Sequence, residues 1–137
     1  MAHILLMEDD EPLAEVIAEL IARHAHTVET CTCATEARDL LSKQQFDLLI
    51  TDILVYQANR PVPDGGISLI TWLRGPTSHL RDNWMRELPI IAISGAGHRA
   101  GMPDVLSVSK DLGADIIIQK PAQPGELLQA ISDLTAR

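Results

Sequence analysis

Short apolar runs alternate with segments of helical periodicity along nearly the whole chain. Four of these runs are rich in Ile and Leu, and they lie at 4–7, 46–53, 88–93 and 116–118. Runs of this length and composition are typical of parallel strands that are buried on both faces of a sheet. A fifth run, at 26–31, is more polar, with Val28 between Thr27 and Glu29. This run predicts a fifth strand at an edge of the sheet.

The segments between the runs predict amphipathic helices, because apolar residues recur in them three and four positions apart. The apolar positions are Leu13, Val16, Ile17, Leu20 and Ile21, then Ala37, Leu40 and Leu41, then Ile67, Ile70 and Leu73, then Val105, Val108 and Leu112, and finally Leu127, Ile131 and Leu134. Gly113 suits the end of the fourth helix and Pro124 the start of the fifth. Five β-α units imply a parallel sheet with right-handed crossovers and helices on both faces, and ligands are then expected at the carboxyl ends of the strands.

Composition narrows the class of protein. With 137 residues, nearly half of them apolar, the chain predicts one domain over 1–137. A net charge of −8 disfavours direct binding to nucleic acid or to anionic lipid. No apolar run approaches the length of a membrane span, and no basic leader precedes the run at 4–7, so we expect a cytoplasmic protein. Cys31 and Cys33 form a lone C-x-C, which predicts ordinary thiols rather than a metal or redox site.

Polar residues with related chemistry follow four of the predicted strands. Glu8 and Asp9 follow the first run, Asp52 ends the third, Ser94 the fourth, and Lys120 the fifth. Oxygen ligands without His or Cys suit a hard cation such as Mg²⁺. Clustered carboxylates repel one another unless a cation or a lysine offsets their charge. The strand ends therefore predict a site for Mg²⁺ and a phosphoryl group.

Two further acids follow directly, at Asp10 and Glu11, and Pro12 opens the first predicted helix. An acid at this position caps the helix and interacts favourably with its positive dipole end. We therefore assign Glu8 and Asp9 to the ligand site and the next two acids to the helix. A shift of one residue would give the site to Asp9 and Asp10 instead.

These residues, in this order and on these elements, resemble the receiver domain of two-component response regulators over essentially the full length. The resemblance implies a flavodoxin-like, doubly wound (βα)5 fold with strand order 2-1-3-4-5 and helices on both faces. It implies that Asp52 is the phospho-acceptor. It also implies an Mg²⁺ site formed by Glu8, Asp9, Asp52 and the backbone carbonyl of Leu54.

The same resemblance assigns the remaining site positions. Ser94, Gly95 and Lys120 match the residues that contact the phosphoryl group, and the bond before Pro121 is expected to be cis. The implied reaction is phosphoryl transfer from the phosphohistidine of a histidine kinase or phosphotransfer protein, followed by slow hydrolysis that the receiver assists. The resemblance thus implies a signalling switch rather than a turnover enzyme. Output is expected through an unknown protein partner, a domain outside this chain, or a homodimer.

Some positions depart from the family pattern. Ile117 stands where receivers commonly carry an aromatic residue that reports phosphorylation on the output face. The segments 56–66 and 75–87 are predicted to be unusually long loops, the first of them beside the site. Trp72 and Trp84 are expected to pack in the core or a loop, and a docking patch is the other interpretation.

Three alternatives remain open. A degenerate receiver would keep the pocket and bind proteins without being phosphorylated. The glycines that follow Ser94 in SGAGHRAG also suit a flavin- or nucleotide-binding loop, although no such motif follows the first strand. A phosphatase that forms a phosphoaspartate would want an acid two residues past the nucleophile, where this chain has Leu54.

Overall fold

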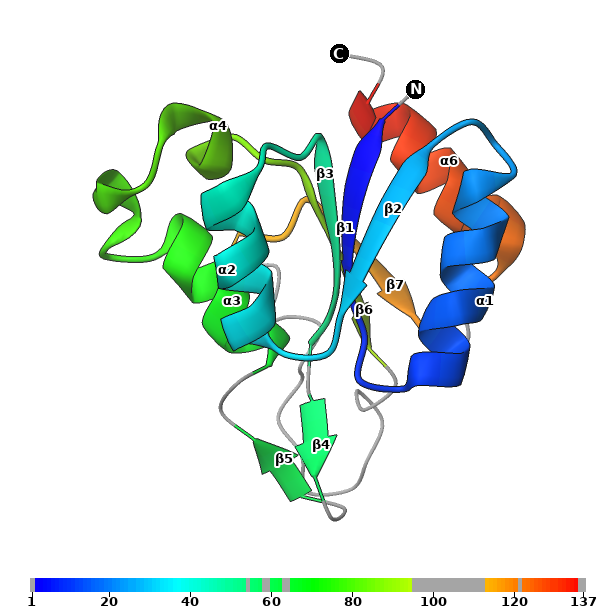
Figure 1. The fold of residues 1–137 in the computed structure, drawn as a ribbon, viewed down its shortest axis with the longest axis horizontal. Helices are drawn as coiled ribbons and strands as arrows, with labels where there is room; N and C mark the ends of the chain where they lie inside the picture. Colours follow the sequence, from blue (N-terminus) through cyan, green and yellow to red (C-terminus); the bar gives the residue numbers. More distant parts are fainter. Residues whose placement is uncertain are drawn as a thin grey trace.

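Five parallel strands form the central sheet of the protein in the computed structural model shown in Figure 1. The structure describes residues 2–53, 55–57, 60–62, 65–94, 113–120 and 122–135, and it describes 55–57, 60–62 and 94 through their backbone only. The strands are β1 (His3–Met7), β2 (Thr27–Cys31), β3 (Leu48–Asp52), β6 (Ile90–Ser94) and β7 (Ile116–Gln119). Their order is β2-β1-β3-β6-β7, which confirms the predicted flavodoxin-like order 2-1-3-4-5 when the sheet strands are counted along the chain.

Helices cover both faces of this sheet. On one face lie α1 (Glu11–Ala22) and α6 (Pro124–Thr135), and on the other lie α2 (Ala34–Lys43), α3 (Gly66–Arg74) and the short α4 (Asn83–Arg86) (Figure 1). Two separate apolar clusters fill the space between sheet and helices, one on each face. Every residue of the central strand β3 is buried, as expected for a strand packed on both sides. No helix within the described ranges is long and apolar enough to cross a membrane.

The two segments predicted as long loops contain regular structure, so that part of the prediction is wrong. An antiparallel hairpin of β4 (Val55–Gln57) and β5 (Arg60–Val62) extends beyond the carboxyl end of the sheet (Figure 1). A 3-10 turn, η1 (Ser78–Leu80), and α4 occupy much of 75–87. Short elements of three or four residues give too little periodicity to be recognised in a sequence. The helix predicted around 105–112 lies outside the described residues.

The first helix begins as predicted, although its apolar stripe is only partly buried. The Asp10 carboxylate accepts a hydrogen bond from the Leu13 N–H at 3.1 Å, which confirms Asp10 as the N-cap. Ile17 and Ile21 are buried, whereas Val16 is 64% exposed. Val16 belongs to the predicted apolar stripe, so one edge of this stripe faces solvent.

The last strand also differs from expectation. Ile118 is buried, but Ile116 and Ile117 are only partly buried, because β7 is the second edge of the sheet. Trp72 and Trp84 pack, partly buried, against the core cluster beside α3, as expected. The Arg81 guanidinium lies 4.1 Å from the centre of the Trp72 ring, in a cation–π contact that covers this side chain.

Candidate functional site

The register of β1 and β3 brings the first two acidic positions together. Met7 of β1 is aligned with Thr51 of β3. Glu8, directly after β1, and Asp52, the last residue of β3, therefore stand side by side at the carboxyl edge of the sheet. Both side chains are buried, with exposed fractions of 2% and 7%. Burial of two neighbouring carboxyl groups is costly unless a cation accompanies them.

The register of the last two strands supplies that cation. Ser94 of β6 is aligned with Gln119 of β7, and Lys120 follows at the same edge of the sheet. The ammonium nitrogen of Lys120 lies 2.7 Å from Glu8 Oε1 and 3.2 Å from Asp52 Oδ2. Lys120 therefore bridges the two buried acids.

Glu8 is held firmly in this arrangement. Its backbone N–H donates to the Cys31 carbonyl of β2 at 2.9 Å, and its Oε2 accepts from the Asp10 N–H at 3.2 Å. With Oε1 on Lys120, both carboxylate oxygens have partners. Glu8 is thus fixed by one near neighbour, Asp10, and by two residues from distant parts of the chain, Cys31 and Lys120.

Three acids form a potential cation site. One carboxylate oxygen from each of Glu8, Asp9 and Asp52 can be chosen so that all three lie within 4.8 Å of one another. Such a set of oxygen donors fits Mg²⁺, which takes one or two carboxylates and fills its remaining positions with water or phosphate oxygens. Cys31 also lies near these acids. Burial raises the pKa of its thiol to about 12, so the thiol stays protonated, unlike a thiolate ligand.

The electrostatics of the site follow from burial. Burial and the adjacent charge of Glu8 raise the pKa of Asp52 to about 8, although Lys120 opposes the shift. Burial alone would lower the pKa of Lys120, but its hydrogen bond and ion pair with Glu8, together with the charge of Asp52, outweigh burial and raise it. The site therefore keeps a charged lysine beside a carboxyl group that is easily protonated in the absence of a metal ion.

The structure brings together four of the residues named from the sequence, which are Glu8, Asp9, Asp52 and Lys120. Ser94 ends β6 as predicted, and its side chain lies outside the described residues, as do Leu54, Gly95 and Pro121.

Sequence reasoning missed two residues that contact the main chain of Asp52. The Thr51 hydroxyl donates to the Asp52 carbonyl at 3.0 Å, and Gly66 at the start of α3 lies against the same carbonyl. The consecutive glycines at 65 and 66, directly before an apolar helix, were the available signal for the second contact.

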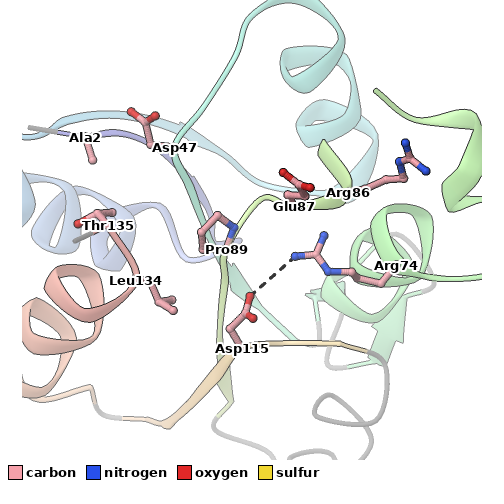
Figure 2. Close-up of a pocket in the computed structure, with 9 residues that line it drawn as sticks. All are labelled: Ala2, Asp47, Arg74, Arg86, Glu87, Pro89, Asp115, Leu134 and Thr135. Atoms are coloured by element: carbon pink, nitrogen blue, oxygen red, sulfur yellow. Dashed lines mark ion pairs between the residues drawn. The ribbon is translucent and has the colours of Figure 1, made fainter. Parts of the chain in front are cut away.

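A second polar hollow, of about 690 Å³, lies at the opposite end of the sheet (Figure 2). Its most buried charged group, Arg74, lies 3.8 Å from Asp115 and donates to the carbonyls of Met85 and Leu88. The guanidinium therefore ties α3 to the carbonyls in and after α4 and to Asp115, directly before β7.

Comparison with known proteins agrees with the geometry. Residues 4–132 match the family model of the response regulator receiver domain, and the chain belongs to this family. It is 30% identical over 135 residues to the transcriptional regulatory protein GltR of Pseudomonas aeruginosa, and the match covers 98% of this chain and 49% of that protein. The chain thus spans about half the length of the curated relatives it matches.

Solved structures show the same fold. The signal receiver domain of a signal transduction histidine kinase from Syntrophus aciditrophicus is similar with a TM-score of 0.79 and 26% identity, covering 99% of this chain and 91% of that one. The receiver domain of a sensor histidine kinase from Pseudomonas aeruginosa is similar with a TM-score of 0.77 and 20% identity, covering 99% and 98%. That crystal structure has a magnesium ion coordinated in the active site cleft.

Proposed function

We propose that this chain, over 1–137, is a phospho-accepting switch of a two-component system in which Asp52 receives a phosphoryl group from a phosphohistidine. The observation that carries the proposal is the buried Asp52 carboxylate at the end of the central strand, 3.2 Å from Lys120 and grouped with Glu8 and Asp9. Membership of the receiver family supports a signalling role, and the grouping of these side chains supports the choice of Asp52 as acceptor.

The proposed reaction is a transfer between two nucleophiles. A carboxylate oxygen of Asp52 attacks phosphorus, the new O–P bond forms, and the N–P bond to the donor imidazole breaks. The imidazole nitrogen keeps the electron pair and takes a proton from solvent. Lys120 is already within reach of Asp52, so it can pair with the oxygens of the transferred group.

Glu8, Asp9 and Asp52 would hold Mg²⁺, which supplies positive charge next to the carboxylates and the phosphoryl oxygens. The side chain of Glu8 has a second task, because it contacts Lys120 in the absence of phosphate. Hydrolysis would then return Asp52 to its starting form, and the lifetime of the phosphorylated state would time the signal.

A groove beside the site supports a helical phosphodonor. The groove, of about 410 Å³, runs between α1 and α6, is mainly apolar, and has Lys120 in its lining. Val16 is exposed on α1 and lies in this lining. We infer that an amphipathic helix of a histidine kinase or phosphotransfer protein packs in the groove and presents its phosphohistidine to Asp52.

Acceptance of a phosphoryl group is tested with a small-molecule donor. Acetyl phosphate with Mg²⁺ is expected to add one phosphoryl group by intact mass, and Asp52→Asn or a chelator is expected to abolish the addition. A folded protein that binds Mg²⁺ and stays unmodified would favour the degenerate receiver. A bound yellow chromophore would favour a flavin site, and steady hydrolysis of phosphate monoesters would favour a phosphatase.

Donor docking is tested with a matched pair of exposed apolar residues. Val16 in the groove and Leu80 on η1 are exposed by 64% and 66%. Val16→Asp should slow transfer from a phosphorylated kinase or phosphotransfer protein about 10-fold or more and leave acetyl phosphate labelling unchanged. Leu80→Asp should change neither rate. Equal effects of the two variants on protein-to-protein transfer would contradict docking in the groove.

A further inference from the structure

Two residues contact the main-chain carbonyl of Asp52. The Thr51 hydroxyl is completely buried and donates to the carbonyl oxygen at 3.0 Å. The first residue of α3, Gly66, lies so close that a Cβ atom built there would be 1.9 Å from the same oxygen. The acceptor residue is therefore held through its backbone as well as through its carboxylate.

The position of Gly66 requires glycine because of space. Besides the oxygen, the added Cβ would lie 2.8 Å from the Asp52 carbonyl carbon and 2.8 Å from Ile53 Cα. All three neighbours are backbone atoms, which cannot rotate away as a side chain can.

The surrounding backbone has little freedom to yield. Ile53 is fully buried, its N–H donates to the Ile93 carbonyl at 3.0 Å, and its carbonyl accepts from the Ile67 N–H at 3.2 Å. A methyl group at Gly66 must therefore displace either the start of α3 or the end of β3. The end of β3 carries Asp52.

We propose that Thr51 and Gly66 form a carbonyl clamp, which fixes the end of β3 and thereby positions the Asp52 carboxylate for cation binding and phosphoryl transfer. This role rests on the proposed function of Asp52. Both residues act through the main chain of Asp52, so they are positioning residues. The carboxylate depends on such placement because it must meet Lys120 and the oxygens of Glu8 and Asp9 at short range.

Four controls separate positioning from loss of stability. Gly75, at the other end of α3, is also tight, because a Cβ there would lie 2.5 Å from the Thr71 carbonyl oxygen. Gly125→Ala is a neutral control, since nothing lies within 4 Å of a Cβ at that position. Thr135→Val matches Thr51→Val, because the Thr135 hydroxyl donates to a main-chain carbonyl, that of Ile131, at 2.7 Å. Wild type completes the set.

The experiment measures three quantities on each variant: urea stability in chelator, the Mg²⁺ dissociation constant by calorimetry, and the rate of labelling by acetyl phosphate. Misplacement of a reacting group by about 1 Å can cost about 100-fold, so we expect labelling at least 10-fold slower in Gly66→Ala, with Mg²⁺ bound about 5-fold more weakly. Thr51→Val should slow labelling about 3- to 10-fold. Gly75→Ala should lose stability without changing Mg²⁺ affinity or labelling by more than about 2-fold.

Each outcome is decisive. Wild-type Mg²⁺ affinity and labelling in Gly66→Ala, or equal losses in Gly75→Ala, would overturn the clamp. If Gly66→Ala does not fold, the test is the labelling rate of Thr51→Val compared with that of Thr135→Val. Equal labelling rates in these two variants would overturn the clamp. A wild type that binds Mg²⁺ but takes no phosphoryl group would refute the proposed function. The clamp would then be tested by the Mg²⁺ dissociation constants of Gly66→Ala and Gly75→Ala relative to wild type. A wild type that binds no Mg²⁺ contradicts both.

Discussion

Asp52→Asn should stabilise the metal-free protein, by an amount that grows with pH. Burial and the charge of Glu8 raise the pKa of this carboxyl from 3.8 to about 8. The folded protein therefore holds the proton up to about pH 8, whereas the unfolded chain releases it near 3.8. Between these values the unfolded state binds fewer protons, so the stability of wild type falls as pH rises. An asparagine amide carries no charge and is exempt from this loss.

The expected gain in the free energy of unfolding follows from the pKa shift of Asp52. At about 1.4 kcal/mol per pKa unit, the full shift would correspond to roughly 6 kcal/mol. Part of this gain is lost, because the amide of the Asp52→Asn variant must replace the contact of the Asp52 carboxylate with Lys120, although Lys120 stays paired with Glu8. We therefore expect the free energy of unfolding to rise by about 2 kcal/mol above pH 8. For a chain of this size, this corresponds to a rise in melting temperature of roughly 5–10 °C.

Urea unfolding in chelator, at about pH 5 and about pH 8.5, measures the effect. Asp39→Asn is the control, because Asp39 is exposed and its ion pair with Lys43 lies on the surface. The control should change stability by no more than about 0.5 kcal/mol at either pH. An Asp52→Asn variant that is no more stable than wild type at the higher pH, or equally stabilised at both, would refute the assigned burial and charge repulsion.

Three further predictions concern the fold. Asp10→Ala removes the cap on α1 and should cost about 1 kcal/mol in urea unfolding, with Asp133→Ala, on the exposed face of α6, as a near-neutral control. Leu69→Ala opens a cavity in the core beside β3 and should cost about 2–5 kcal/mol, and a cost below about 1 kcal/mol would contradict its complete burial. Gly113 has a φ of +116°, a conformation that side chains rarely adopt, so Gly113→Ala should cost about 1–3 kcal/mol, whereas no loss would contradict this backbone conformation.

The arrangement of the sheet could be predicted from the sequence because each strand is a separate apolar run and the connections are helical. Parallel strands place their carboxyl ends at one edge, so Glu8, Asp52 and Lys120 could be grouped without knowledge of distances. The N-cap role of Asp10 was also predictable, since Asp10 stands directly before the helix. Both inferences use rules that hold over a few residues of chain.

Other features depend on contacts between distant segments. That the Lys120 ammonium lies nearer to Glu8 than to Asp52 could not be predicted, because the three residues come from different strand ends. The hairpin at 55–62 and the short helices near 78–86 are too brief to leave a periodic signal. Val16 has the sequence spacing of a buried helix face, but no described element covers it. Its side chain instead lines the groove between α1 and α6.

The central claim is that the carboxylate of Asp52, among all the acids of this chain, carries the phosphoryl group. Protein labelled with acetyl phosphate and Mg²⁺ can be reduced with borohydride, which converts an aspartyl phosphate to homoserine, and the site can then be read by peptide mass spectrometry. We predict homoserine at position 52 only, and none when Mg²⁺ is omitted. Homoserine at another acidic position, or none in fully folded, Mg²⁺-bound protein, would contradict the account.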